Sequence, residues 1–387
     1  MLTFFSRLFP AANIISTEWR ALTTAVNTQI RERGDNFRCA ESNPSNHSAD
    51  HIAQFYSLPK NDVQTLFTHG GLPKLFKEQC KTFNETCIMI RKPAIDVINS
   101  LKIIDYNKPA YRFVLYGVMG SGRSLSLAHI IHYGHKNGFL LVHVPWVGNW
   151  MRRCRETSNA VMEEGLIDIN IDAAMWLTHF KTQNEELLKD EQFKVSQDYI
   201  WNKREKTAQN ASLLELIDFG INRIKYASSC IVVLAEEIKK LSKSGVCKTL
   251  VAIDGYNAFF HPKTRIFKEN KEIVHPHKVT VTKAFLSLTN FDWNNAGIVV
   301  TVDALAMGEP NPKSFLPKFL LGKEGFEHLD PFIPVEVENY SEKEFISCID
   351  YYNDRKWIQQ YYPELRNELS FVSNNNPFKL QEITGPL

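Results

Sequence analysis

The stretch that decides the fold is YRFVLYGVMGSGRSLSLAHIIH, residues 111–132. It begins with a short aromatic and β-branched run, residues 111–116, which is typical of a buried strand. A glycine-rich loop follows at once, and apolar residues then recur at helical spacing from residue 124 to residue 135. The order of strand, glycine loop and helix predicts a phosphate-binding loop.

The loop matches the pattern GxxxxGK[ST] at every fixed position except one, because Arg123 stands where lysine is usual. Glycines allow such a loop to curl until its N–H groups converge on phosphates, and the next helix presents the positive end of its dipole. We therefore expect the whole loop to bind the phosphates of a nucleotide. It consists of Gly117, Val118, Met119, Gly120, Ser121, Gly122, Arg123 and Ser124.

A magnesium site is predicted beside this loop. The hydroxyl of Ser124 occupies the position that binds Mg²⁺ in phosphate loops. Asp254 ends the apolar run LVAI at 250–253, and a carboxylate at the end of a strand can hold the water shell of the metal. The alternative is that the glycine turn and Asp254 only separate elements of an α/β fold.

Nucleotide binding and hydrolysis need different groups. Arg123 keeps the positive charge, but its forked guanidinium is longer than the lysine ammonium that reaches between the β- and γ-phosphates. Residue 255 is glycine, where ATPases of the AAA type usually place a glutamate that activates water. No general base is evident, so we predict no catalytic residue and slow or absent turnover.

The sequence motifs do not choose guanine over adenine. The tetrad NKRE at 202–205 resembles the guanine signature NKxD only loosely. It also precedes the strand of Asp254 instead of following it. We interpret it as a chance resemblance on the end of a helix.

Four further apolar runs without alternation predict strands that are covered on both faces, at 139–144, 249–253, 297–302 and 332–337. Helical segments separate them, including one after Asp172. Another is introduced by Ser212 and Glu215 at capping-box spacing and ends near Gly245, and Ser341 and Glu344 repeat that spacing. This alternation predicts an α/β fold, an AAA-like P-loop NTPase core with a parallel sheet, a helical insertion and a small C-terminal helical lid.

The predicted organisation has five parts. Residues 1–30 contain Arg7 and Arg20 but one acid, Glu18, which is typical of a mitochondrial presequence, and an ordinary unfolded terminus is the alternative. Residues 31–57 are rich in Asn, Ser and Asp and predict a disordered or extended arm. The other parts are an N-terminal helical adapter at 58–110, the nucleotide-binding core at 111–340 and the lid at 341–387.

Composition narrows the classes of function. The chain has 387 residues with 44% hydrophobic content, enough for a sizeable core, and its net charge is only +2. RNA contact must therefore be local, and Arg152, Arg153 and Arg155 form one basic cluster, for which a solvated helix face is the alternative.

The seven cysteines form no CxxC pair and are expected to be reduced. No apolar run approaches the ~20 residues of a membrane span.

Five landmarks carry a resemblance to a known family: KTFNETCIMIRKPAIDVI at 81–98, the loop stretch at 111–132, YIWNKRE at 199–205, LVAIDGYNA at 250–258 and LLGKEGFEHLDPFIPVEVENY at 320–340. From about residue 58 to its C-terminus the chain resembles the death-associated protein family, GTP-binding proteins of the small subunit of the mitochondrial ribosome. The family usually has lysine in the position of Arg123.

The resemblance implies an AAA-like core that binds GTP or GDP with Mg²⁺ in the mitochondrial matrix. Its implied partners are small-subunit proteins, ribosomal RNA and the large-subunit interface, and a role in apoptosis is attributed to the family. Three hypotheses follow. The first is a structural ribosomal protein with the nucleotide as a structural ligand, and the second is an active GTPase or ATPase switch in cell-death signalling. In the third, Arg123 fills the phosphate site and no nucleotide binds.

Overall fold

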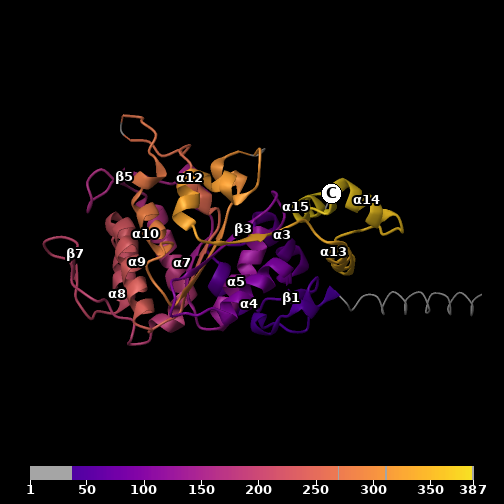
Figure 1. The fold of residues 1–387 in the computed structure, drawn as a ribbon, viewed down its shortest axis with the longest axis horizontal. Helices are drawn as coiled ribbons and strands as arrows, with labels where there is room; N and C mark the ends of the chain where they lie inside the picture. Colours follow the sequence, from indigo (N-terminus) through magenta and orange to yellow (C-terminus); the bar gives the residue numbers. More distant parts are fainter. Residues whose placement is uncertain (1–36, 269, 310–311, 386–387) are drawn as a thin grey trace, which may run out of the picture.

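The computed structural model describes residues 37–385 except 269, 310 and 311. Its centre is a five-stranded parallel sheet in the order β11–β3–β10–β9–β4 (Figure 1). The strands are β3 (Tyr111–Tyr116), β4 (Leu140–Val144), β9 (Thr249–Ile253), β10 (Ala296–Thr301) and β11 (Ile333–Glu336). The predicted α/β class with a parallel sheet is confirmed, and each of the five predicted strands is present to within one residue at either end.

Helices cover both faces of the sheet. The elements on one face are α4 (Lys92–Ile103) and α5 (Arg123–Lys136), and those on the other include α7 (Asn170–Leu188), α9 (Ala227–Lys243) and α10 (Thr280–Leu288). In β9, Leu250 and Ala252 pack with the first layer, whereas Val251 and Ile253 pack with the second. Burial on both faces explains why the strands are unbroken apolar runs.

The insertion between β4 and β9 differs from the single long helix expected after Ser212. It contains α8 (Leu213–Asn222), the 3-10 turn η4 (Ile224–Tyr226) and α9, because Arg223 adopts a non-helical backbone at φ −110° and ψ 68°. Ser212 does cap α8, by accepting a hydrogen bond from Leu214 N. Smaller elements complete the region: α6 (Val147–Arg153), β5 (Ser158–Asn159) paired with β6 (Ile167–Asp168), and β7 (Tyr199–Ile200) paired with β8 (Lys206–Thr207).

The N-terminal described residues are more ordered than the predicted arm. They form the 3-10 turns η2 (Pro44–Asn46) and η3 (Ala49–His51) and the strand β1 (Phe55–Ser57), which pairs with β2 (Cys87–Met89). Phe37 and Phe55 are buried, and the Phe55 ring stacks on Tyr351 with centroids 4.3 Å apart. A few aromatic anchors therefore order a polar segment. The predicted presequence at 1–30 lies outside the described residues.

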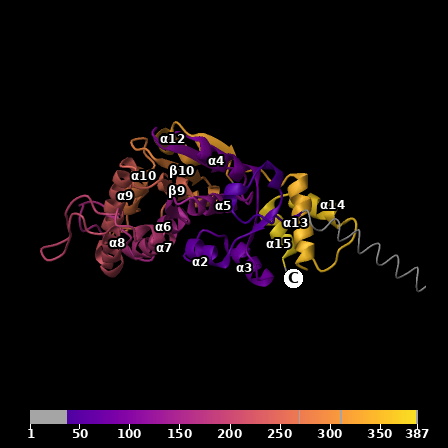
Figure 2. The ribbon, with the colours of Figure 1, turned by 90° about the horizontal axis from the view of Figure 1, so that it is seen from below.

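The remaining helices flank the core. The adapter carries α2 (Lys60–Phe67) and α3 (Lys74–Phe83), and the segment between β9 and β11 carries η5 (Tyr256–Phe259), η6 (Pro276–Lys278), α11 (Ala304–Met307) and α12 (Pro317–Leu329). The C-terminal helices are α13 (Glu342–Asp354), α14 (Leu365–Ser373) and α15 (Pro377–Thr384). Figure 2 shows these last three at one end of the molecule beside α3. The capping box of Ser341 and Glu344 at the start of α13 is confirmed.

All seven cysteines are free, as expected for reduced structural thiols. Burial raises the pKa of several of these thiols, and that of Cys80 reaches about 11. Across residues 37–385, no described helix combines the length and the apolarity that a bilayer span requires.

His132 and His143 are two of the buried histidines, and each faces a polar partner from another element. Burial lowers the pKa of His132 on α5 to about 4, although Asp62 Oδ2 lies 3.1 Å from its Nε2. Burial also lowers the pKa of His143 on β4 to about 3, and its Nδ1 lies 3.0 Å from Nε2 of His179. Because an unfolded histidine titrates near pH 6.5, the unfolded chain binds more protons than the folded chain below that pH. Stability is therefore lost as the pH falls from about 6.5 toward 4.

We predict that the free energy of unfolding falls by about 1 kcal/mol per buried histidine between about pH 6.5 and pH 5.5, measured by urea denaturation. His143→Gln should make this pH dependence shallower. His275→Gln, at a partly exposed side chain that precedes η6, is the control and should keep the wild-type dependence. If the free energy of unfolding depends equally steeply on pH in both variants, the assignment of this dependence to buried histidines is contradicted.

Candidate functional site

The loop between β3 and α5 has the curled backbone that phosphate loops need. Gly117 has φ +155° and Gly120 has φ +81°, both in the region that favours glycine. A Cβ at Gly117 would collide with the carbonyl oxygen of Val337, and one at Gly120 would lie 2.6 Å from Oδ1 of Asn376. The two glycines thus serve both the turn and the close packing of neighbouring chain on the loop.

Three consecutive carbonyl oxygens of the loop accept hydrogen bonds from outside it. The pairs are Met119 O with Asn376 Nδ2 at 3.0 Å, Gly120 O with Phe378 N at 3.2 Å, and Ser121 O with Arg91 Nη1 at 2.6 Å. Since a peptide group directs its carbonyl and N–H oppositely, holding the Ser121 carbonyl outward directs the N–H of Gly122 inward. The lid and the adapter therefore set the orientation of the loop.

The inward side of the loop carries donors without partners. Within the described part of the chain, no acceptor is found for the N–H groups of Gly122, Arg123 and Ser124. The hydroxyl of Ser121 is also buried with no hydrogen-bond partner among the described residues. These groups stand at the N-terminus of the 14-residue helix α5, where the helix dipole favours an anion. A phosphate group fits this donor set.

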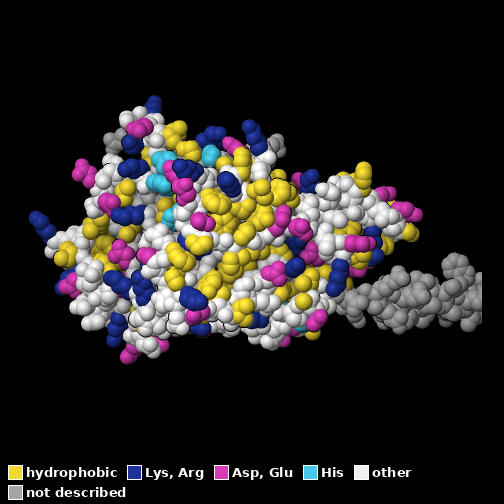
Figure 3. Space-filling view, viewed as in Figure 1, with side chains coloured by type: hydrophobic (Ala, Val, Ile, Leu, Met, Phe, Trp, Pro, Cys, Tyr) yellow, Lys and Arg dark blue, Asp and Glu magenta, His cyan; other side chains and the backbone are white. Residues whose placement is uncertain are grey.

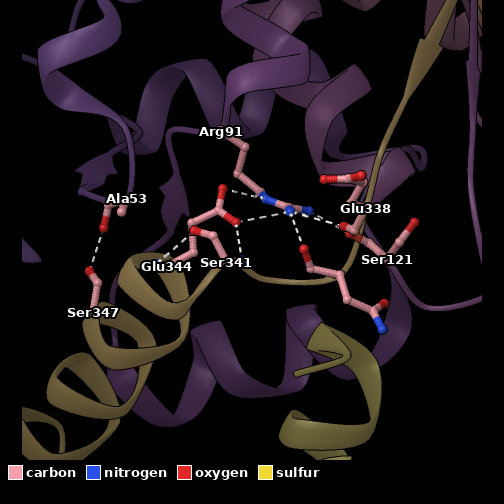
Figure 4. Close-up of polar contacts among 8 residues, drawn as sticks. Ala53, Arg91, Ser121, Glu338, Ser341, Glu344 and Ser347 are labelled. Carbon is pink, nitrogen blue, oxygen red and sulfur yellow. Dashed lines mark hydrogen bonds and ion pairs between the residues drawn. The ribbon is translucent and has the colours of Figure 1, made fainter. Parts of the chain in front are cut away.

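Arg91 joins three parts of the molecule through one buried guanidinium (Figure 4). Its Nε lies 3.0 Å from Oε1 of Glu344, and its Nη2 lies 3.1 Å from Oε2 of the same carboxylate. It also donates to Ser121 O in the loop and to Glu338 O, the latter at 3.0 Å. The Tyr340 ring lies 5.0 Å from the guanidinium carbon. The adapter, the phosphate loop and the lid thus meet at Arg91.

Arg123 is the first residue of α5, and its side chain is buried. Its Nη2 lies 2.6 Å from Oδ2 of Asp303, and its Nη1 donates to the carbonyl oxygen of Val302. The guanidinium is therefore held at the end of β10, beside the loop. A bound phosphate must share Arg123 with Asp303 or displace that carboxylate.

The two predicted metal residues lie together. Asp254, at the end of β9, is buried and accepts a hydrogen bond from the hydroxyl of Thr301. Burial raises the pKa of Asp254 to about 6, and the nearby hydroxyls of Thr301 and Ser124 oppose the rise. A hydroxyl and a carboxylate are the hard oxygen ligands that Mg²⁺ prefers. The described residues contain no cluster of three His, Cys, Asp or Glu able to hold a metal, so phosphate oxygens and water would complete its coordination.

Residue 255 supplies no side chain for catalysis. Gly255 has φ +71° and precedes η5, where Asn257 is buried. The Asn257 amide brackets the backbone of Asp303, donating to its carbonyl oxygen at 2.8 Å and accepting from its N–H at 2.9 Å. These contacts position the partner of Arg123, and no general base stands at the position where AAA-type ATPases place one.

A cavity extends from the loop between the adapter and the lid. Its lining combines aromatic, apolar and amide side chains, including Phe76, Gln79, Met89, Tyr340, Tyr352 and Gln381. Oε1 of Gln79 accepts hydrogen bonds from Tyr352 OH at 3.2 Å and Gln381 Nε2 at 2.8 Å. An apolar cavity with a few amide groups, opening from a phosphate loop, has the character of a site for a nucleotide base.

The tetrad at 202–205 lies elsewhere. It forms the turn between β7 and β8, and Figure 1 shows β7 at the opposite end of the molecule from the lid. Asn202 Oδ1 accepts from the backbone N–H groups of Arg204 at 2.8 Å and Glu205 at 3.0 Å. The expected helix end is therefore a hairpin turn, and Asn202 stabilises that turn.

Sequence reasoning brought the loop, Ser124 and Asp254 together but missed Arg91 and Asp303. Asp303 follows a buried strand directly, just as Asp254 does, so the same signal was present. Arg91 stands between the apolar runs CIMI and PAIDVI, and a charge flanked by core segments is a signal for a buried ion pair. The contact of Asn376 with the loop had no local signal.

Comparison with known proteins adds independent information. The model of a family described as mitochondrial ribosomal death-associated protein 3 matches residues 88–383. The small ribosomal subunit protein mS29 of Bos taurus is 39% identical over 353 residues, which cover 90% of this chain and 88% of that protein. The protein of the same name from Mus musculus is 36% identical over 353 residues, covering 90% and 89%.

We predict that Glu344→Gln destabilises the protein by about 3 kcal/mol, because the buried Arg91 loses its only charged partner among the described residues. Glutamine keeps a side-chain oxygen for the helix cap, so the loss of stability reports on the ion pair alone. Glu342→Gln, exposed on the same helix turn, is the matched control and should change stability little. Urea denaturation measures both, and equal effects would contradict the prediction.

Proposed function

The chain belongs to the family of mitochondrial ribosomal death-associated protein 3, and from this premise we propose that it holds a guanine nucleotide with Mg²⁺ as a structural ligand. It is a structural protein of the small subunit of the mitochondrial ribosome, located in the mitochondrial matrix. The nucleotide and the metal are the proposed additions to that role.

The observation that carries the nucleotide proposal is the inward set of free N–H groups. Arg91 holds the Ser121 carbonyl outward and so fixes the N–H of Gly122, while the first turn of α5 fixes the N–H groups of Arg123 and Ser124, so these donors need no rearrangement to meet an anion. Donors that are already oriented lose little entropy on binding. The Arg123 guanidinium lies beside the loop but is paired with Asp303, so a bound phosphate would share its positive charge with that carboxylate.

The proposed Mg²⁺ would be held by Ser124 and Asp254, and it would neutralise charge on the phosphates. The buried Asp254 carboxylate, whose pKa is raised to about 6, is stabilised in its charged form by such a cation. Without a base near Gly255 the site favours retention over turnover. A ligand that binds only the folded state adds stability in proportion to the logarithm of its concentration over its Kd.

Contact with neighbouring ribosomal proteins is supported by the surface. Figure 3 shows apolar side chains gathered across the middle of one face, in the region of β11 and α12. Exposed large apolar residues of these elements and their connections include Leu316, Phe319 and Ile333. Extended apolar surface is typical of protein interfaces. Contacts with small-subunit proteins and with the large-subunit interface are part of the proposal.

A second candidate function is an active nucleotide switch in cell-death signalling. The observation in its favour is that Asn376 and Phe378 of the lid bond directly to the loop, so a change at the phosphates would reach the lid. The absence of a side chain at Gly255 weighs against efficient hydrolysis. We place this candidate second, together with any apoptotic role.

The proposal is tested by denaturing the purified protein, identifying any released nucleotide by chromatography, and following the tagged chain through a mitoribosome sedimentation profile. We expect GTP or GDP to be released and the chain to sediment with the small subunit. Co-sedimentation without nucleotide would overturn the structural-ligand proposal. Steady phosphate release that disappears in Asp254→Ala would favour the switch.

We predict that Arg123→Lys raises affinity for a fluorescent GTP analogue with Mg²⁺ by about tenfold, or ~1.4 kcal/mol. The shorter lysine cannot make the two-sided contact with Asp303 and Val302, so its charge becomes available to the phosphates. Arg112→Lys, at another buried arginine on β3, is the matched control and should leave affinity unchanged. Unchanged or weaker binding by Arg123→Lys would show that Arg123 already serves the phosphates.

A further inference from the structure

A second concentration of positive charge lies around α6, away from the inner face of the phosphate loop. Arg152 and Arg153 end α6, Arg155 follows it, and Arg265 comes from the segment after η5. We call these four residues the α6 arginine cluster. They line two adjacent hollows that share Trp146, Asn149 and Arg153. Figure 2 shows α6 near α7 and β9 in the middle of the molecule.

The fold holds this cluster in place. The backbone N–H of Arg265 donates to Met151 O at 2.8 Å, which ties the distant segment to α6. Nη1 of Arg152 donates to Leu305 O at 2.9 Å, and a Cβ on Gly308 would lie 2.6 Å from the Arg152 guanidinium carbon. Arg153 and Arg265 are exposed. Two elements far apart in sequence thus bring like charges to one surface.

The cluster carries more positive charge than the described residues around it balance. Every arginine salt bridge in the described residues involves some other arginine. Asp172 lines the hollow of Arg153 and Arg155 and accepts the backbone N–H of Arg155 at 2.9 Å, so it offsets part of the charge of four arginines. Because like charges repel, a cluster with this excess of positive charge favours an anionic partner.

An aromatic ring stands among these arginines. Trp146 is half-buried, and a Cβ on Gly255 would lie 2.9 Å from its Cζ3 atom, so the six-membered ring is held against Gly255. Arginine forks match the geometry of phosphate oxygens, and a fixed aromatic ring can stack a nucleic acid base. The same surface therefore offers arginines for phosphate groups and an aromatic ring for a base.

We propose that the α6 arginine cluster binds the sugar-phosphate backbone of an unpaired segment of ribosomal RNA, with a base stacked at Trp146. This goes beyond membership of the ribosome by naming the RNA-binding surface and the form of RNA that it takes. It does not depend on the nucleotide proposed for the phosphate loop. The modest net charge of +2 is consistent with one local RNA contact.

The test uses the full chain and a fluorescein-labelled single-stranded RNA of about 20 nucleotides, with anisotropy followed between about 50 and 200 mM salt. The double variant Arg153→Gln/Arg265→Gln should bind at least about tenfold more weakly. Its plot of log affinity against log salt should be shallower by about 1.4, since each single-strand phosphate contact contributes about 0.7. Measurements with and without GTP and Mg²⁺ separate this surface from the phosphate loop.

The matched control is Lys203→Gln/Arg204→Gln, which removes the same charge from exposed positions of the β7–β8 turn. It should bind RNA within about twofold of wild type. Trp146→Leu should weaken binding at least about fivefold without changing the salt slope, because stacking releases no counterions.

Three outcomes overturn the proposal. One is equal weakening in the cluster variant and the control. Another is a cluster variant that keeps its RNA affinity and its salt slope. The third is a cluster variant that binds RNA as the wild type does but no longer binds a polyglutamate peptide. That result would assign the surface to an acidic protein. Thermal melts of each variant confirm folding, and the exposed Arg153 and Arg265 keep the test valid if Trp146→Leu fails to fold.

Discussion

The buried guanidinium of Arg91 is the contact on which the rest of the site depends. A charge inside a protein is tolerated only when it is paired and fully hydrogen-bonded. Arg91 obtains its counter-charge from Glu344 in the lid and its other acceptors from Ser121 and Glu338. Because all partners must be present together, the adapter, the phosphate loop and the lid are coupled energetically. Both carboxylate oxygens of Glu344 take part in this coupling, Oε1 at 3.0 Å from Nε and Oε2 at 3.1 Å from Nη2.

From this coupling follows the character of the site. Arg91 and Asn376 hold the loop carbonyls from outside, and the pair Arg123–Asp303 joins the loop to the end of β10. A loop held on so many sides is preorganised for binding. With Gly255 beside it and no general base, it is suited to keeping a ligand. A bound nucleotide would strengthen contacts that already connect the three parts of the chain, which suits a ribosomal protein.

Particular elements show where local reasoning succeeded and where it did not. The five core strands were predictable because burial on both faces leaves an unbroken apolar run, as in residues 249–253. The cap of α13 was predictable because Ser341 and Glu344 act within one helix turn. Residues 31–57 were expected to be a disordered or extended arm, because anchors such as Phe55 are buried by residues of β2 and α13 that are distant in sequence. The break at Arg223 had no proline to signal it, and the nearby Gly220 lies inside α8.

The sequence by itself determined the class of the fold and the place of the glycine loop between β3 and α5, because strand burial, glycine geometry and helix capping act between residues close in the chain. It also placed Ser124 and Asp254, each at the end of a regular element. Only the tertiary structure decided what Arg123 contacts, which side of the loop is free, and that Arg91 meets Glu344 across 253 residues. The physical reason is that ion pairs and close packing form between groups that no local pattern relates, so they exist only once the sheet and the lid have come together.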